Sequence, residues 1–101
     1  MLKRGRAFNL DIVTLTGAPK ECHRNTALAF TGGLIPSIVT GFAIGPDNVW
    51  LEHSWGLNHE RNATIETTME MTAYYGVQPT PTECQRFVYL ASFGFPYATL
   101  I

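Results

Sequence analysis

Residues 38–68 decide the fold and read IVTGFAIGPDNVWLEHSWGLNHERNATIETT. Within them, three segments have the β-branched, aromatic or alternating composition of strands: Ile38 to Ile44, Val49 to Leu57 and Ala63 to Thr68. The segments between them, 45–48 and 58–62, have the composition of turns. Three successive strands joined by short turns predict an antiparallel meander.

Helices are predicted on both sides of the meander. Residues 19–31 begin with a proline, whose missing N–H costs nothing in a first turn, and stop before two glycines. Residues 81–92 follow Thr80 and include Glu83, and these two residues form a capping box. We therefore expect an α+β fold, with a small antiparallel sheet of three to four strands packed against an N-terminal helix that bears Cys22 and a C-terminal helix.

The ends of the chain complete this expectation. Residues 7–15 predict an extended, partly buried segment, although their apolar alternation changes parity midway. The apolar tail, residues 93–101, is expected to dock on the core, with a homo-oligomer contact as the alternative. Residues 1–101 are expected to form a single domain, because 101 residues suffice for one core and not for two.

Composition excludes several classes of protein. The chain is 46% hydrophobic and 12% aromatic, which is typical of a globular protein. Its formal net charge of -1 gives no reason to expect nucleic acid or an anionic membrane as partner. No apolar stretch reaches the roughly 18 residues needed to span a bilayer, and no signal-peptide pattern is present. We expect a cytoplasmic protein, in the host cytoplasm if phage-encoded, with two free cysteines.

Cys22 is the candidate nucleophile because it lies in the first turn of the predicted N-terminal helix. First-turn N–H groups and the helix dipole favour a thiolate there. The helix end supplies only about 0.3–1 kcal/mol, which is under one pKa unit. A neighbouring imidazolium must therefore supply the rest of the activation.

His53 is the candidate base among three histidines. It lies in a predicted strand whose alternation directs it inward between Leu51 and Trp55. His23 adjoins the cysteine, but adjacent helical residues point about 100° apart, so we expect it to face elsewhere. His59 lies in a polar turn and is expected to be solvated.

Glu66 is the candidate orienting residue, on an assumption about register. If the turn after the second strand closes symmetrically about His59 and Glu60, Leu57 faces Asn62 and His53 faces Glu66. Glu66 would then hold one imidazole nitrogen while the other addresses the cysteine. A slip of one residue would turn Glu66 to the opposite face, leaving Thr67 or Thr68 as weaker orienting residues.

Other residues are candidates for supporting or alternative roles. Trp55 shares the strand face of His53, and Asn25, one turn after Cys22, either supports the site and an oxyanion or faces solvent. The Cys22 backbone N–H is the more general oxyanion donor. Cys84 is an alternative nucleophile, because the Pro-x-Glu-Cys-x-Arg pattern around Cys22 recurs around it.

No cofactor is expected. The cysteines and histidines lack the CxxC, HxxxH and HExxH spacings of metal sites, and no glycine-rich phosphate loop follows a strand.

Four segments together resemble small uncharacterised phage and bacterial proteins with a papain-like or transglutaminase-like core: Glu21-Cys22-His23-Arg24-Asn25-Thr26-Ala27, Trp50-Leu51-Glu52-His53-Ser54-Trp55, Ile65-Glu66-Thr67-Thr68 and Tyr74-Tyr75-Gly76-Val77. The resemblance covers residues 19–77 and implies the order nucleophile Cys22, base His53 and orienting acid Glu66. Many such proteins carry aspartate at the third position, where this chain has glutamate. The family implies thiol chemistry on amide or acyl groups and names no substrate.

Two functions follow from these features. The first is a cysteine hydrolase, deamidase or acyl transferase that acts on a protein or a small amide. The second is a non-catalytic phage-type binding protein that engages a host or defence component through its aromatic and apolar surface.

Overall fold

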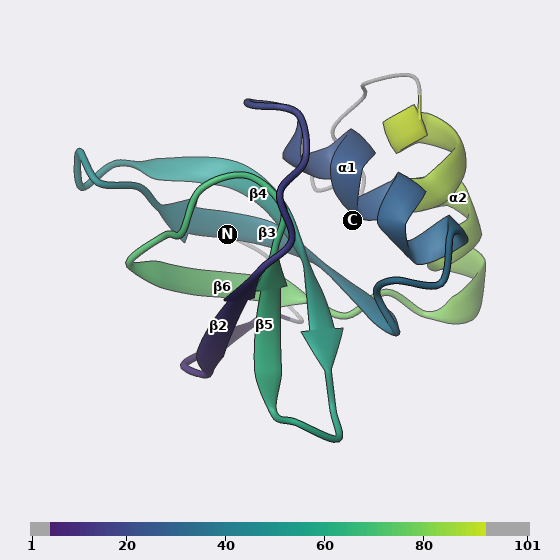
Figure 1. Ribbon diagram of the computed structural model, residues 1–101, viewed down its shortest axis with the longest axis horizontal. Helices are drawn as coiled ribbons and strands as arrows, with labels where there is room; N and C mark the ends of the chain where they lie inside the picture. Colours follow the sequence, from purple (N-terminus) through teal and green to yellow (C-terminus); the bar gives the residue numbers. More distant parts are fainter. Residues whose placement is uncertain (1–4, 93–101) are drawn as a thin grey trace.

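The computed structural model describes residues 5–92, which form an α+β fold of two helices and one six-stranded sheet. The elements are β1 (Arg6–Phe8), β2 (Asp11–Thr14), α1 (Cys22–Thr31), β3 (Ser37–Ile44), β4 (Trp50–Asn58), β5 (Ala63–Glu66), β6 (Ala73–Val77) and α2 (Pro81–Ser92). The strand order is β1-β6-β3-β4-β5-β2. Figure 1 shows the two helices together on one side of the curled sheet.

The meander predicted from residues 38–68 is confirmed as β3, β4 and β5, paired antiparallel in sequence order. Its first turn closes through a hydrogen bond from the Gly45 N–H to the Val49 carbonyl. Each of the two turns holds one asparagine in the left-handed region, Asn48 at φ 65° and Asn62 at φ 52°. Asparagine tolerates this conformation better than other residues with a β-carbon, so the turn composition explains the local geometry.

The sheet is larger than expected and is mixed. Three or four antiparallel strands were predicted, but β6 pairs antiparallel with β3, and residues 7–15 form two strands instead of one. β1 pairs antiparallel with β6 at one edge of the sheet, whereas β2 pairs parallel with β5 at the other. Only Asn9 and Leu10 connect these two opposite edges. The sheet therefore curls so that its two edge strands come near each other. The apolar alternation of residues 7–15 changes parity where the chain passes from one edge strand to the other.

A close approach between neighbouring strands accounts for two glycines. Gly41 on β3 faces Gly76 on β6, and a β-carbon on Gly41 would run into the backbone of Tyr75 and Gly76. A β-carbon on Gly76 would lie 2.8 Å from both the Thr40 carbonyl oxygen and the Trp55 ring. Any larger residue would separate these strands.

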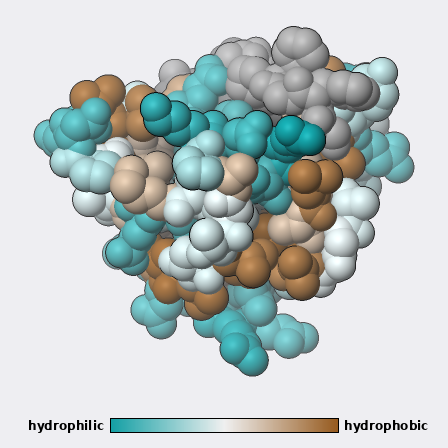
Figure 2. All heavy atoms as spheres, turned by 45° about the horizontal axis from the view of Figure 1, so that its top comes forward, coloured by the Kyte–Doolittle hydropathy of each residue, from teal (hydrophilic) through white to brown (hydrophobic). Residues whose placement is uncertain are grey.

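Two apolar clusters hold the layers together. The concave side of the sheet encloses the first cluster, which consists of Phe8, Val39, Ala43, Trp55, Leu57, Met71 and Tyr74. The second lies between the sheet and the helices and consists of Ala27, Ile38, Phe87 and Ala91. On the face shown in Figure 2, apolar side chains form separate patches among hydrophilic ones. Within residues 5–92, neither helix is long and apolar enough to cross a membrane.

The two helices begin differently. The predicted capping box of α2 is confirmed, because the Thr80 N–H donates to Glu83 Oε1 at 3.0 Å and the Glu83 N–H donates to Thr80 Oγ1 at 3.3 Å. α1 begins at Cys22 and not at Pro19, since Lys20 adopts φ 62° in the preceding turn. Cys22 is thus the first residue of its helix. The docking predicted for the tail concerns residues 93–101, which lie outside the described residues.

Candidate active site

A divergence of two strands creates the site. β4 pairs with β5 only at its last three residues, where Gly56 faces Ile65, Leu57 faces Thr64 and Asn58 faces Ala63. The first part of β4, which includes His53, has β3 on one side and no β5 residue paired on the other. Cys22, at the start of α1, uses this gap to reach His53.

The predicted hairpin register is wrong by two residues. Leu57 faces Thr64 and not Asn62, because the turn is centred one residue later and Asn62 closes it with a hydrogen bond from its N–H to the His59 carbonyl. Side chains alternate with a period of two, so a shift of two residues keeps every side chain on its original face. His53 and Glu66 therefore still share a face, and their side chains meet.

Glu66 is a fully satisfied buried carboxylate, with 0% of its surface exposed. Its Oε1 accepts hydrogen bonds from His53 Nε2 at 2.7 Å and from the Tyr74 hydroxyl at 2.9 Å. Its Oε2 accepts from the Thr68 N–H and from the Thr68 hydroxyl, both at 2.9 Å. Burial alone would raise the pKa of Glu66, but the bond to His53 with its charge and the two Thr68 donors lower it. The carboxylate therefore stays ionised.

Two of these contacts were not expected from the sequence. Thr68 was considered as an alternative partner of His53, but it orients Glu66 instead. Tyr74 comes from β6, a strand that was not predicted, and its hydroxyl also accepts the Met71 N–H at 3.1 Å. The tyrosine-aromatic-glycine-valine motif was the available signal, although it named no role for Tyr74.

His53 is 2% exposed and has its ring fixed from two sides. The bond from Nε2 to Glu66 leaves Nδ1 as the nitrogen for Cys22. Trp55 stacks beside the ring at a centroid distance of 5.9 Å and Tyr74 lies at 6.1 Å. Burial alone would lower the pKa of His53, but hydrogen bonds to Cys22 and Glu66 and the negative charges on both raise it to about 9. The imidazolium is therefore the form present at neutral pH.

Cys22 is 9% exposed and has its thiol between two imidazoles. Burial alone would raise its pKa, but hydrogen bonds to His23 and His53 and the positive charges on both rings lower the pKa to about 6. The helix end by itself gives under about one pKa unit, so the imidazoles dominate. Between pH 6 and pH 9 the pair exists as thiolate and imidazolium.

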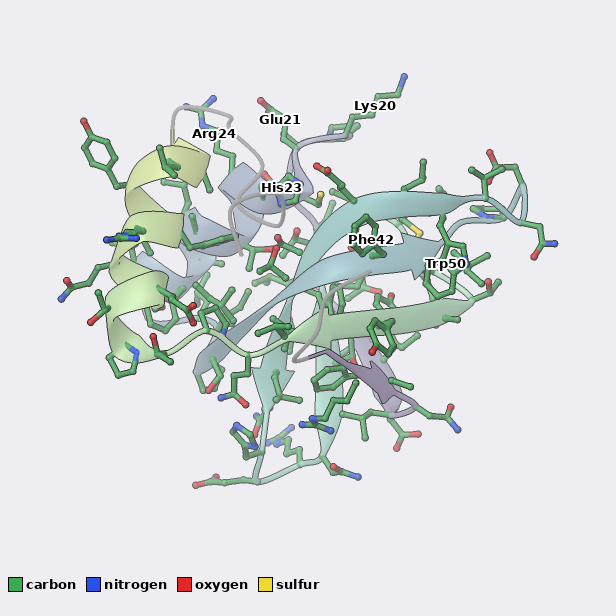
Figure 3. The ribbon with its side chains drawn as sticks, turned by 180° about the vertical axis from the view of Figure 1, so that it is seen from behind. Lys20, Glu21, His23, Arg24, Phe42 and Trp50 are labelled. Carbon is green, nitrogen blue, oxygen red and sulfur yellow. The ribbon has the colours of Figure 1, made fainter. Side chains whose placement is uncertain are left out.

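The expectation that His23 faces away from the site is wrong. Its Nδ1 lies 2.6 Å from the Ser54 hydroxyl, and that hydroxyl lies 2.9 Å from the Thr40 hydroxyl. Ser54 follows His53 on β4, so the two point to opposite faces of the sheet. Cys22 and His23 point about 100° apart on α1. Cys22 therefore lies toward the His53 face of β4, and His23 toward the Ser54 face. Figure 3 shows His23 directed toward the sheet while Lys20, Glu21 and Arg24 point away from it.

Asn25 is bonded to the backbone of the turn that precedes α1. Its Oδ1 accepts a hydrogen bond from the Ala18 N–H at 3.2 Å, and its Nδ2 donates to the Ala18 carbonyl at 2.7 Å. A β-carbon on Gly17 would lie 2.6 Å from this carboxamide, so the glycine makes room for it. The N–H of Cys22 belongs to the first turn of α1, where an amide has no acceptor within its helix.

Trp55 forms the wall of the site beside His53. It is fully buried, and its ring also meets Tyr74 at a centroid distance of 4.9 Å and Phe8 at 5.9 Å. Its indole nitrogen is among the buried polar atoms without a hydrogen-bond partner in the described part of the chain. The ring therefore acts through shape, by holding His53 at the strand face.

Cys84 and His59 lie apart from these residues. Cys84 packs beside the cluster between sheet and helices and lines an apolar cleft of about 780 Å³ with Phe30 and Val88. Burial raises the pKa of its thiol, and no imidazole counteracts that effect. The exposed His59 ring bonds to the Gln78 side chain. Among residues 5–92 no three histidine, cysteine or acidic side chains form a group that could hold a metal ion.

Comparisons with protein-family models, with curated proteins and with solved structures found no match. The function of the site therefore has to be inferred from its own geometry.

Proposed function

We propose that the protein is a thiol-dependent hydrolase, deamidase or acyl transferase that acts on an amide or acyl group of a protein or small molecule. Cys22 is the nucleophile, His53 the general acid and base, and Glu66 the orienting acid. The observation that carries this proposal is the buried bond of 2.7 Å between His53 Nε2 and Glu66 Oε1, which leaves Nδ1 for the thiol. A carboxylate that binds an imidazole, and an imidazole that serves a thiol, form the minimum set of groups for nucleophilic cysteine catalysis.

The proposed fold is correspondingly a minimal papain-like or transglutaminase-like core. Such a core places the cysteine at a helix start and the histidine and acid on neighbouring strands, in that chain order. Here the same order runs through α1, β4 and the end of β5. The sheet carries β1 and β2 as its two edge strands.

The reaction begins with the thiolate. Cys22 Sγ attacks the substrate carbonyl carbon, a C–S bond forms, and the carbonyl oxygen gains the negative charge near the Cys22 N–H. When the tetrahedral intermediate collapses, the C–N or C–O bond to the leaving group breaks and His53 gives it the proton from Nδ1. A thioester and a neutral imidazole remain.

The second half reaction restores the enzyme. Neutral His53 takes a proton from water, or from an amine or alcohol acceptor, as that nucleophile attacks the thioester carbonyl. The C–S bond breaks, the acyl group leaves as acid, amide or ester, and the thiolate and imidazolium return. Glu66 stabilises the imidazolium at both ends of the cycle and keeps its own charge.

An acylation assay tests this proposal. The protein is mixed with p-nitrophenyl acetate, nitrophenolate release is followed by absorbance, and the acyl adduct is located by mass spectrometry of peptides. We expect a transient thioester on Cys22 that turns over, no adduct at that peptide in Cys22→Ala, and acylation slower by at least about a hundredfold in His53→Ala. Cys84→Ala is the matched control and should behave like the unaltered protein. Acylation of both cysteines at equal rates would overturn the proposal.

A non-catalytic binding protein is the second candidate, and the apolar cleft favours it. The cleft is lined by Phe30, Ile38 and Val88 together with three prolines, and Cys22, His53 and Glu66 are not among its lining residues. If the chain acts only by binding, Cys22→Ala keeps its biological effect and Val88→Asp abolishes it. The enzymatic proposal expects the reverse dependence on Cys22.

The same proposal places the protein in the cytoplasm, of a host cell if the chain is phage-encoded. A nucleophilic thiol needs reducing conditions, and both cysteines are free. A homo-oligomer formed through residues 93–101 remains a prediction.

A further inference from the structure

The second imidazole at the nucleophile has an anchor of its own. Thr40 and Ser54 lie directly opposite each other on β3 and β4, both are fully buried, and their hydroxyls are 2.9 Å apart. His23 Nδ1 lies 2.6 Å from the Ser54 hydroxyl. Two adjacent strands and α1 therefore converge on one ring nitrogen of a histidine that is only partly buried.

This anchor is independent of the one that holds His53. His53 is bound by Glu66 on the concave face of the sheet, whereas His23 is bound by Ser54 on the face toward the helices. Both rings lower the pKa of the Cys22 thiol. In the described part of the chain a hydroxyl, and not a carboxylate, is the partner of His23 Nδ1.

The Ser54 hydroxyl occupies Nδ1 of His23. A serine hydroxyl can donate its proton to Nδ1, and its own oxygen can accept the proton of the Thr40 hydroxyl. A neutral imidazole that accepts at Nδ1 carries its proton on Nε2. Nε2 is then the nitrogen left to face the thiol, and it does so as a donor.

We propose that His23 is a positioning residue of the thiol site: the buried Thr40–Ser54 pair holds its Nδ1, and its Nε2–H donates a hydrogen bond to the Cys22 thiolate. The inference rests on the proposed function in taking Cys22 as the nucleophile. The thiolate then has two imidazole donors, His53 and His23. Only His53 carries a proton through the reaction, while His23 holds the sulfur in line for attack.

Two substitutions of His23 separate this role from simple packing. Glutamine places an amide nitrogen close to the position of Nε2, so His23→Gln keeps a donor for the thiolate. Asparagine places its polar atoms close to Nδ1, so His23→Asn keeps the Ser54 contact and loses the donor. Ser54→Ala leaves His23 in place and removes the hydroxyl that holds its Nδ1.

The experiment measures the rate of Cys22 alkylation by iodoacetamide between pH 4 and pH 10, with Cys84→Ala as the background and no substrate present. A hydrogen bond to a charged group shifts a pKa by about one unit or more, so at pH 6 we expect alkylation of His23→Asn to be slower by about tenfold. His23→Gln should stay within about twofold of the background, and Ser54→Ala should fall between the two. His59→Gln, a change in an exposed histidine remote from the thiol, is the control and should have no effect.

Nitrogen-15 chemical shifts of the imidazole provide a second readout that a structural role would not affect. They should report a proton on Nε2 of His23 at pH 7. A His23 ring without a proton on Nε2 at pH 7, or equal alkylation of His23→Asn and His23→Gln, would overturn the proposal. Circular dichroism of each variant verifies that it folds. Because no turnover is measured, the role of His23 at the thiol can hold even if the acylation assay fails, and the reverse is also true.

Discussion

Replacing Glu66 with glutamine tests the central contact of the site. Glu66→Gln keeps the shape of the side chain and removes its charge. In the native protein both carboxylate oxygens accept two hydrogen bonds, and the Thr68 N–H must keep an acceptor. The glutamine oxygen is therefore expected to turn toward Thr68, which leaves the amide NH₂ facing His53 Nε2. That group donates to a neutral imidazole and repels an imidazolium.

The magnitude follows from the loss of one buried, charge-assisted hydrogen bond. Such a bond contributes about 1.5–3 kcal/mol, and 1.36 kcal/mol corresponds to one pKa unit. The pKa of His53, raised to about 9 in the native protein, should fall by about one to two units. The neutral ring then supports the Cys22 thiolate less well, so the pKa of Cys22 should rise from about 6. The pH interval in which thiolate and imidazolium coexist becomes narrower from both sides.

Two assays measure these limits. Nitrogen-15 spectra follow the titration of His53, and the pH dependence of Cys22 alkylation follows the thiol. Glu70→Gln, at an exposed glutamate four residues later, is the matched control and should change neither limit. If Glu66→Gln leaves the His53 titration near pH 9, the carboxylate does not set the charge of the imidazole and the reasoning fails.

Three further outcomes are expected. At pH 6, iodoacetamide should alkylate Cys22 at least about ten times faster than Cys84, because the Cys22 thiol is half ionised whereas burial raises the pKa of the Cys84 thiol. Equal rates of alkylation of the two cysteines, measured by peptide mass spectrometry, would contradict this prediction. Asn25→Ala loses two hydrogen bonds to the preceding turn and should lower the free energy of unfolding by about 1 kcal/mol, which corresponds to a melting temperature lower by about 4–8 °C. The titration of Cys22 should not change. An unchanged melting temperature would show that the two bonds contribute nothing to stability. In urea unfolding, ionisation of Cys22 makes the free energy of unfolding rise with pH between about 6 and 9, and deprotonation of His53 makes it fall between 6.5 and about 9, so the two slopes should cancel there. Below pH 4.5 the free energy of unfolding should fall as Glu66, whose pKa is lowered on folding, becomes protonated. A steep slope near pH 8 would argue against the ion pair.

Local chemistry in the sequence was sufficient for several features. The strands of the meander and the start of α2 follow from β-branched alternation, turn residues and a capping box, which act over a few neighbouring residues. The inward face of β4, with His53 and Trp55 side by side, follows from the alternation of a single strand. The proximity of Glu66 was predicted through a wrong register and survives because an error of two residues preserves the face.

Only the tertiary structure decided the remaining features. The pairing of β1 with β6 and of β2 with β5 joins segments that are far apart in the chain, and nothing in residues 6–14 indicates which partner each half takes. Tyr74 reaches Glu66 only because β6 enters the sheet beside β3. The sequence predicted that His23 faces away from the site, because adjacent helical residues point about 100° apart. That rule considers the helix alone, and the strand edge that both side chains reach is a feature of the sheet. By itself, the sequence determined that His53 and Glu66 share a strand face and can meet, since residue identity and strand face are local properties. How many imidazoles meet the thiol depended on where β5 leaves β4, and that is a property of the whole sheet.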